Sequence, residues 1–304
     1  MASVRVARGT LARWWRLGDR AAPVSPGEVE AVRSVFQWPG KSMPTAALTR
    51  QHDAGDAAGS AWLRADPAHV RADMATARML ACGELGLSLA DCASISRELK
   101  PLFGDAGFEF DARLPQRWYV RASSGVQLPS AATPDEALGD DLKLHLPEGS
   151  AGKQWRQLFN EAQIILHNHP VNAERARIGA VAVNSLWFWG GGRLPDWVRS
   201  DLTLLISDRA ELQSLADLAS VTRAPLSTGI VSGIKQVEGS GRRVLIDLFE
   251  LRADSLEENG FAVLDAMMRS GECSSVSLLF ASGERLRFRP SHRLRFWRRT
   301  SDLA

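Results

Sequence analysis

The chain lacks the features that mark secreted or membrane-spanning proteins. It has only three cysteines, Cys82, Cys92 and Cys273, and an odd, scattered set does not form a disulfide framework. No apolar run approaches the roughly 18 residues that a membrane-spanning helix needs. The basic N-terminal segment contains no apolar stretch of the kind found in signal peptides. We therefore expect a cytoplasmic protein without a membrane partner.

A strong charge imbalance is also missing. The net charge is +2, so the whole molecule is not a polyanion binder by bulk electrostatics. Apolar residues make up 45% and charged residues 24%, which is typical of a globular protein. The length of 304 residues allows one large domain or two of moderate size.

Helical and strand patterns intermix along the chain, which indicates an α/β or α+β fold. Strands are expected at 61–64, 107–110, 118–120, 181–189, 203–206, 244–249, 276–280 and 285–289. Helices are expected at 69–80, 89–103, 155–166, 209–219 and 256–269. The first helix is predicted from Asp66-Pro67, which resembles an N-cap followed by proline in the first turn. Residues 1–45 give no clear pattern, and 52–56 resemble a loop.

The densest chemistry lies in a glycine run after an apolar strand, Trp187-Phe188-Trp189-Gly190-Gly191-Gly192-Arg193. Backbone N–H groups of a loop without Cβ atoms can turn together towards an anion. Arg193 could add a bidentate contact to phosphate or carboxylate, and Asn184 could orient the loop or the ligand. The alternative is a tight turn whose tryptophans lie in the core.

Two histidines precede this run, in His167-Asn168-His169-Pro170. Residues two apart at a helix end point in nearly opposite directions, so a metal site is disfavoured. His169 is expected to turn inward. A hydrogen bond from His169 or Asn172 to a substrate or a neighbouring loop is the better hypothesis, and Arg175 follows in the same segment.

Two further segments carry charge. Residues 64–73 hold Asp66, His69 and Arg71 at an expected strand-to-helix junction, a place that lines sites in α/β folds. Residues 285–299 carry seven arginines and no acid, alternating with apolar residues. Phosphate binding needs such charge, but a solvated strand face followed by a basic tail is the favoured interpretation, so nucleic acid is not an expected partner.

Several catalytic motifs are absent from the sequence. There is no Walker-type phosphate loop, no Gly-x-Ser-x-Gly elbow and no Cys-x-x-Cys pair. Clusters of histidine, cysteine and acidic residues with metal-binding spacing are also missing, so no metal or other cofactor is expected.

Four blocks of the chain resemble the RpfE-type regulatory proteins of proteobacteria. They are GDAAGSAWLRADPAHVRADM (55–74), LFGDAGFEFDARLPQRWYVR (102–121), DEALGDDLKLHLPEG (135–149) and LHNHPVNAERARIGAVAVNSLWFWGGGRLP (166–195). These proteins are in turn related to archaeal-type cofactor-independent phosphoglycerate mutases. The resemblance to the mutases is narrower, covers roughly residues 85–195, and rests on His169-Pro170-Val171-Asn172, Asn184 and Trp189-Gly190-Gly191-Gly192.

The resemblance implies a degenerate alkaline-phosphatase-like core with an inserted α+β subdomain. Residues 46–84 and 196–304 would form the reduced core, and 85–195 the insert. The mutases use two metal ions and a Ser or Thr nucleophile, supplied by segments on either side of the insert. Those segments here lack Asp-Gly-x-x-Asp, Asp-x-x-x-His and Gly-Asp-His arrangements. The mutase reaction is therefore expected to be lost.

Three hypotheses follow. The first is a catalytically degenerate regulatory relative that binds a small phosphorylated or carboxylated metabolite, with an unknown regulatory protein partner. The second is an active mutase with manganese or another divalent metal, and the third is a protein- or DNA-interaction module using the arginine-rich C-terminus. The predicted ligand-binding residues are His169, Asn172, Arg175, Asn184, Trp187, Trp189, Gly190, Gly191, Gly192, Arg193, Asp66, His69 and Arg71.

Overall fold

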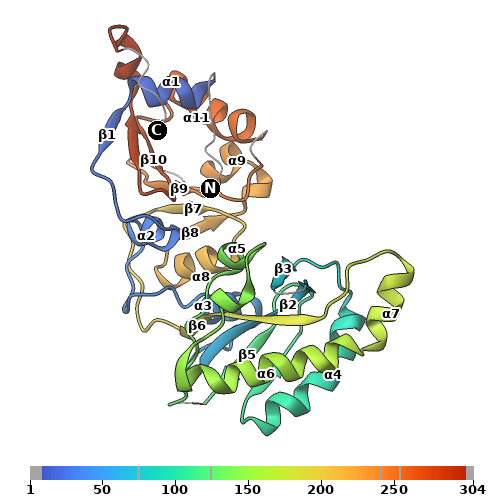
Figure 1. Ribbon diagram of the computed structural model, residues 1–304. Coiled ribbons are helices and arrows are strands. Elements are labelled where there is room, and N and C mark those ends of the chain that lie inside the picture. Colours follow the sequence, from blue (N-terminus) through green and yellow to red (C-terminus); the bar gives the residue numbers. More distant parts are fainter. Residues whose placement is uncertain are drawn as a thin grey trace. The chain divides into compact units, whose positions relative to one another are not determined.

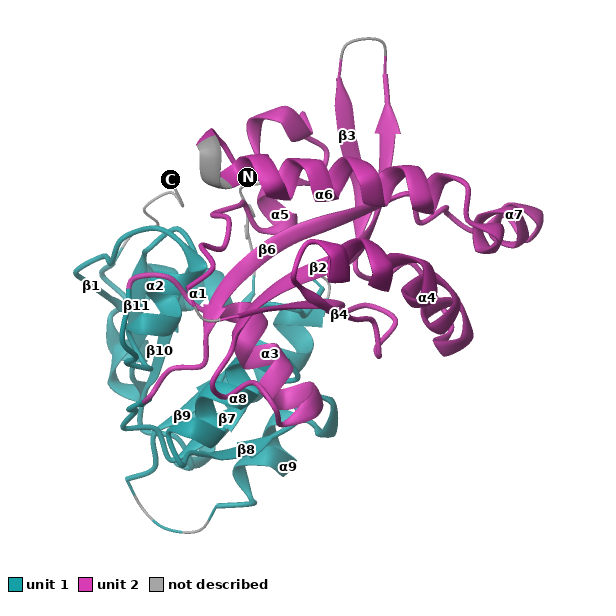
Figure 2. Cartoon of the chain, turned by 90° about the horizontal axis from the view of Figure 1, so that it is seen from below, with its two compact units in different colours: residues 1–40, 197–304 teal, residues 41–196 magenta. Residues whose placement is uncertain are grey.

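The chain folds into two compact units in a computed structural model (Figure 2). One unit comprises residues 1–40 and 197–304, and the other comprises residues 41–196. The structure describes residues 9–73, 76–123, 125–237, 239, 241–252 and 255–298, and for residues 150 and 151 the backbone alone. Both units mix helices and strands, which confirms the expected class.

The unit 41–196 is built on a five-stranded antiparallel sheet (Figure 1). Its strands are β2 (Ala61–Ala72), β3 (Ala77–Cys82), β4 (Glu109–Asp111), β5 (Tyr119–Ala122) and β6 (Ser185–Arg193). The long β2 lies at the centre. Its first half pairs with β5 and its second half with β3, while β6 runs along its other edge.

Helices cover both faces of this sheet because β2 and β5 place apolar side chains on both faces. The helices are α3 (Thr45–Ala54), α4 (Leu89–Asp105), α5 (Pro134–Ala137), α6 (Gly149–His167) and α7 (Pro170–Arg177), with the short turn η1 (Leu142–Leu144). On the face covered by α4 and α6, Leu63, Val120 and Phe188 pack into the main core. Helix α3 covers the opposite face (Figure 2). There, Trp62 and Tyr119 pack against Ala46 and Ala47 of α3.

The expected helix at 69–80 is wrong, because residues 69–72 lie in β2 and residues 77–80 lie in β3. Asp66 and Pro67 pair with Trp187 and Leu186 of β6, about 120 residues further along the chain. Pro67 has no backbone N–H to donate, but its carbonyl oxygen accepts from Gly83 N–H at 2.8 Å. Long-range pairing has therefore overridden a local helix signal.

The expected loop at 52–56 is also wrong in its first part. Residues 52–54 complete α3, and Gly55 ends the helix with a left-handed φ of 72°. Glycine is the common residue at this position because it lacks a Cβ.

The two units do not follow the expected division of the chain. The boundary expected between 84 and 85 falls inside one unit, since β2 and β3 share a sheet with β5 and β6. Residues before 41, expected to lack a clear structure, include α1 (Thr10–Leu17), β1 (Asp19–Ala21) and α2 (Glu28–Arg33). They belong to the same unit as 197–304.

The unit of residues 1–40 and 197–304 contains two small sheets (Figure 1). Strands β7 (Leu204–Ile206), β8 (Thr222–Ala224) and β9 (Val244–Ile246) are parallel, in the order β8-β7-β9. Strand β11 (Arg285–Phe288) pairs antiparallel with β1 and with β10 (Val276–Leu279). The expected strands at 203–206, 244–249, 276–280 and 285–289 are thus confirmed, with shorter bounds.

Helices complete this unit. They are α8 (Ala210–Leu218), α9 (Ile230–Ile234) and α11 (Ala262–Ser270), with the 3-10 helices η2 (Leu226–Thr228) and η4 (Pro290–Leu294) and the π-helix η3 (Leu256–Phe261). Trp14 of α1 stacks on Phe288 at 5.4 Å between ring centroids, and Phe261 meets Trp14 edge-on. In the part of the chain that the structure describes, no helix combines the length and apolar character needed to cross a bilayer.

Candidate functional site

The glycine run continues β6 rather than leaving it as a loop. Strand β6 reaches Arg193, with Gly192 paired to Trp62 and Trp189 to Arg64. Gly190 and Gly191 together oppose the single residue Leu63, and Gly190 has a φ of +65°, the geometry of a β-bulge opened by glycine. The expectation of a glycine loop is therefore wrong.

Close packing explains why these glycines have no side chains. A Cβ on Gly192 would lie 2.5 Å from Pro44 Cβ, and one on Gly191 would lie 3.1 Å from Leu63 Cδ1. On Gly190 it would lie 3.1 Å from Thr45 Cβ. The run thus lets the beginning of α3 and the facing side chains approach β6.

Asn184 and His69 attach the segment before β6 to the end of β2. The Asn184 amide accepts from Val70 N–H at 2.8 Å and donates to Val70 C=O at 2.7 Å. His69 Nδ1 lies 2.9 Å from the carbonyl oxygen of Ala182. Both side chains extend the strand pairing by a few residues.

His169, Asn172 and Arg175 form a second clamp, around α7. His169 is buried, and its Nδ1 accepts from Val171 N–H at 3.2 Å, capping the helix. The amide of Asn172 donates to the carbonyls of Leu166 and Val183 and accepts from Val183 N–H at 2.8 Å.

Arg175 completes this clamp from within the protein. Its buried guanidinium donates to the carbonyl oxygens of Val181 at 2.7 Å, Gly86 at 3.3 Å and Leu85. A backbone carbonyl carries no net charge, so it attracts a guanidinium less strongly than an anion does. All three hydrogen bonds would nevertheless have to break before Arg175 could bind an anion.

The two histidines that suggested a metal site point apart. His169 is buried, whereas His167 is exposed. Among the described residues, no group of three or more His, Cys, Asp or Glu side chains is placed to hold a metal ion.

Asp66 lies in the strand, not at a helix cap, and forms a buried ion pair with Arg64. The contacts are Arg64 Nε to Oδ1 and Nη2 to Oδ2, both at 2.8 Å. Trp189 Nε1 and Trp118 N–H donate to the same carboxylate at 2.7 and 3.2 Å. Burial raises the pKa of Asp66, and these four donors work against that rise.

An ionic network beside this pair is not apparent from the sequence. Arg50 of α3 pairs with Asp56 and Asp111 at 2.5 Å, and its guanidinium lies 4.5 Å from the Trp62 ring centroid. A hydrogen bond from Arg50 lowers the pKa of Asp56. In the sequence, what could have indicated this network is the spacing of Arg50 and Asp53, which places both on one face of α3.

Asp53 holds the other side of this network. Arg117 contacts both carboxylate oxygens, at 2.6 and 2.7 Å, and Tyr119 donates its hydroxyl at 2.5 Å. Burial raises the pKa of Tyr119, and the Asp53 charge adds to the rise. A phenol that donates to a carboxylate is held neutral.

The predicted site residues therefore do not gather at one place. Asp66 and Trp189 meet at the Arg64 pair, while His69, His169, Asn172, Arg175 and Asn184 make separate clamps. Trp187 donates its indole N–H to Ala132 C=O at 3.0 Å. Arg71 and Arg193 are exposed at the ends of β2 and β6.

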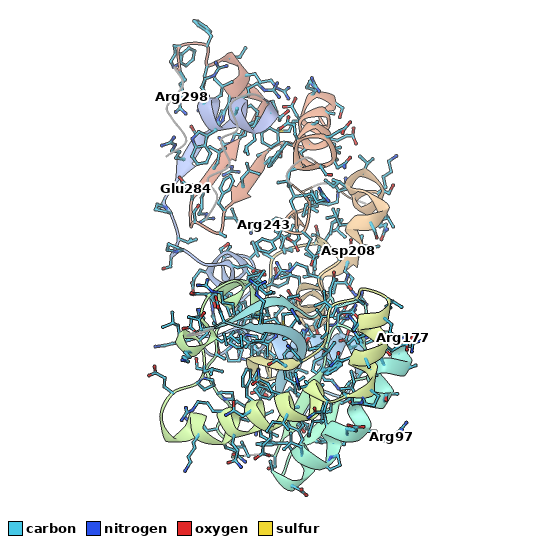
Figure 3. All side chains as sticks on the ribbon, turned by 45° about the vertical axis from the view of Figure 1, so that its right-hand side comes forward. Arg97, Arg177, Asp208, Arg243, Glu284 and Arg298 are labelled. Atoms are coloured by element: carbon cyan, nitrogen blue, oxygen red, sulfur yellow. The ribbon has the colours of Figure 1, made fainter. Side chains whose placement is uncertain are left out.

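A different cluster lies at the carboxyl edge of the parallel sheet, where open α/β sheets place their ligands. Ser207, Asp208 and Arg209 follow β7, and Asp247 follows the neighbouring β9. Ser207 Oγ donates to Asp247 Oδ2 at 2.9 Å. Asp208, labelled in Figure 3, accepts the N–H groups of residues 226 and 227, both at 3.0 Å.

Arg209 contacts three acids at or near this edge. Its guanidinium contacts Glu28, lies 2.7 Å from Glu211 Oε1 and 3.9 Å from Asp247 Oδ2. Burial works against its charge, but the carboxylates raise the pKa of Arg209 further above its ordinary value. Burial also raises the pKa of Glu28. These carboxylates are committed to a guanidinium and do not fit a divalent metal.

Comparison with known proteins relates the chain to one group. It is 28% identical over 109 residues to a probable 2,3-bisphosphoglycerate-independent phosphoglycerate mutase of Geobacter sulfurreducens, covering 36% of this chain and 27% of the relative. It is 27% identical over 114 residues to the Methanosarcina mazei enzyme, covering 38% and 27%. The chain is a distant relative of cofactor-independent phosphoglycerate mutases.

The similarity is partial. The chain spans about a quarter of the length of these two curated relatives, and no family model matches it. A cofactor-independent phosphoglycerate mutase from Thermoplasma acidophilum aligns with 92% of this chain and 82% of its own, at 17% identity and a TM-score of 0.43. A Pyrococcus horikoshii protein, PH0037, aligns with 86% of this chain and 68% of its own, at 11% identity and a TM-score of 0.44.

Proposed function

We propose that this protein is a regulatory, catalytically degenerate relative of the phosphoglycerate mutases, of the RpfE type, that binds a small phosphorylated or carboxylated metabolite without converting it. The observation that carries the proposal is the engagement of Arg209 with Glu28, Glu211 and Asp247. A two-metal phosphoryl-transfer centre needs free carboxylates to hold its cations. Here an internal guanidinium supplies the positive charge.

The buried ionic pairs of the unit 41–196 support the same conclusion. Arg64 and Asp66 satisfy each other, and Asp53 is occupied by Arg117 and Tyr119. Breaking such a buried pair is costly, and a substrate would have to displace a partner to reach these groups. Of the predicted ligand-binding residues, Arg193 and Arg71 have exposed guanidinium groups that an anion could reach without displacing a buried partner. We assign the anion contact to Arg193.

A coupled mutase assay tests the loss of catalysis. We expect no conversion of 3-phosphoglycerate to 2-phosphoglycerate with manganese, cobalt or magnesium present. Turnover that a chelator abolishes would overturn the proposal and establish the alternative, an active metal-dependent mutase, which the similarity to the curated relatives favours.

Calorimetric titration tests ligand binding separately. We expect 3-phosphoglycerate or phosphoenolpyruvate to bind, and Arg193→Ala to weaken binding by about tenfold, since a charged hydrogen bond contributes about 1.5–3 kcal/mol. Arg97→Ala is the matched control, because Arg97 is an exposed arginine on α4 (Figure 3). An equal loss of affinity in both variants, or no binding by the wild type, would contradict the proposal that this protein binds such a metabolite through Arg193.

A further inference from the structure

The chain after β11 turns its apolar side chains outward. Leu294 is 72%, Phe296 89% and Trp297 65% exposed, three large apolar residues within four positions. Figure 1 shows this last part of the described chain, in red, extending past α1. Contiguous exposed apolar residues of this size mark an interaction surface rather than ordinary solvent exposure.

The basic side chains of the same segment turn inward and hold it in place. Arg295 Nη1 lies 2.6 Å from Asp19 Oδ1 and donates to Leu17 C=O at 3.1 Å. Arg298, labelled in Figure 3, donates to the carbonyls of Leu17 and Gly18. These carbonyls end α1, where the helix dipole favours cations.

Arg293 provides the second attachment. It donates to Asp265 Oδ1 at 3.1 Å, the carboxylate that also binds Arg13 at 2.7 Å. Because the arginines rather than the apolar residues bind the rest of the unit, the outward position of Leu294, Phe296 and Trp297 is fixed by ion pairs and does not depend on their own packing.

The segment and its attachments carry more arginines than carboxylates. Arg13, Arg293, Arg295 and Arg298 share two carboxylates, those of Asp19 and Asp265. A further two arginines, at 287 and 289, are exposed just before η4. The surface therefore combines leucine, phenylalanine and tryptophan with a surplus of arginine.

We propose that Leu294, Phe296 and Trp297, with Arg287 and Arg289, form a docking surface for an anionic lipid bilayer. Trp, Phe and Leu insert at the headgroup boundary, and arginines beside them attract anionic lipids. A nucleic acid fits less well, because Phe296 and Trp297 meet edge-to-face at 82° and offer no parallel stacking faces, and leucine has none. Binding would be reversible and would not involve a membrane-spanning helix.

Cosedimentation with vesicles tests this docking surface. The full chain should bind vesicles of phosphatidylcholine with phosphatidylglycerol and not vesicles of phosphatidylcholine alone. Binding should fall steeply between about 0.1 M and about 0.5 M salt, as the Debye length shortens. Equal binding to both vesicle types would contradict the role of the arginines.

Paired variants separate the two components. Phe296→Ser with Trp297→Ser should weaken binding by at least tenfold, and Arg287→Gln by about fivefold, since each basic residue near a charged surface contributes about 1 kcal/mol. Ile164→Ser is the matched control, because Ile164 is an exposed apolar residue, 64% accessible, in the unit 41–196. Its binding should equal that of the wild type.

Other occupants would give different results. Sedimentation equilibrium that shows a dimer for the wild type and a monomer for the Phe296/Trp297 variant, without vesicle binding, would assign the surface to a second copy. Salt-sensitive binding of a single-stranded oligonucleotide, lost in the same variant while vesicles remain unbound, would assign it to nucleic acid. Either result overturns the lipid assignment, and neither bears on the mutase assay.

Discussion

Trp189 donates its indole N–H to Asp66 Oδ2 across a distance of 2.7 Å, from β6 to β2. The sequence predicted that both residues belong to a ligand site. The structure makes them partners of each other, with Arg64 as the counterion. The hydrogen bond between Trp189 and Asp66 and the ion pair with Arg64 therefore explain these polar residues as part of the fold.

Replacing Asp66 with Ala should strongly destabilise the protein. The substitution leaves the buried Arg64 guanidinium without its counterion, and breaking a buried pair in this way costs about 3–5 kcal/mol. Urea denaturation followed by circular dichroism measures the loss in the free energy of unfolding.

Trp189→Phe is the control for this variant. It keeps the ring over Arg64, whose guanidinium lies 5.1 Å from the ring centroid, and removes one hydrogen bond. We expect a loss of about 1–3 kcal/mol, the value of one hydrogen bond to the buried carboxylate, whose Oδ2 still accepts from Arg64. Equal effects of the two substitutions would show that the ion pair is not the dominant contribution.

Replacing Asn172 should lower the stability of the fold, whatever its effect on ligand affinity. Its amide joins the end of α6 to Val183 through three hydrogen bonds. Asn172→Ala leaves the buried N–H and C=O groups of Val183 unpaired, whereas Leu166 C=O still accepts from His169 N–H, and we expect a loss of about 2–4 kcal/mol. Thermal unfolding monitored by calorimetry is the measurement.

Asn168→Ala provides the comparison, because Asn168 lies nearby, is exposed and makes one bond to Ile164 C=O at 3.0 Å. Its effect should stay within about 0.5 kcal/mol, as for most surface changes. If Asn172→Ala is equally mild and instead abolishes metabolite binding, the clamp is secondary to a ligand role.

Periodicity predicted most elements of the fold. Helices α4 and α6 carry long apolar stripes that one face of a helix must bury. Helix α4 was expected close to its observed bounds, whereas α6 was expected from residue 155 and begins at Gly149. Strand β2 was largely missed, because its partners β6 and β5 are distant in sequence and Asp66-Pro67 imitates a helix start. The local sequence pattern does not reveal the stabilisation that a strand gains by pairing with distant segments.

The candidate site was less predictable than the fold. The sequence identifies polar side chains in an apolar context, but not whether the partner of each is a ligand or another residue. Asn184 and Asn172 bind backbone groups of residues 70 and 183, which only the folded chain brings near. Arg50 and Asp53 were missed because no helix was expected over residues 45–54, and residues 52–56 resembled a loop.

The glycine run offers a test of packing against ligand binding. Gly192→Ala places a Cβ 2.5 Å from the rigid Pro44 ring, so either β6 or the start of α3 must shift. Overpacking of this kind costs about 1–3 kcal/mol. Gly104→Ala is the matched control, because it lies in α4 with no atom within 4 Å of the added Cβ, and it should stabilise by up to about 1 kcal/mol. Opposite signs in urea denaturation support the packing role, and unchanged stability with lost metabolite binding would refute it.

The pH dependence of stability should reveal the carboxylate of Asp265. Burial alone would raise its pKa, but hydrogen bonds from Arg293, Trp14 and Arg13 outweigh burial and lower the pKa below the ordinary 3.8. A carboxyl with a lowered pKa in the folded state stabilises the fold above its unfolded value, and this contribution is lost as the pH falls through the folded value.

Asp265→Asn removes that contribution at every pH. At about pH 7 the variant should be less stable than the wild type by about 1.5–3 kcal/mol, the value of a hydrogen bond to a charged group. Towards about pH 2 the two stability curves should converge, because the wild-type carboxyl is then protonated as well. Urea denaturation across this range measures the difference, in which the titration of all other carboxyls cancels. A gap that stays constant with pH would mean that Asp265 acts through its shape and neutral bonds, and that the arginines around it are held by other groups.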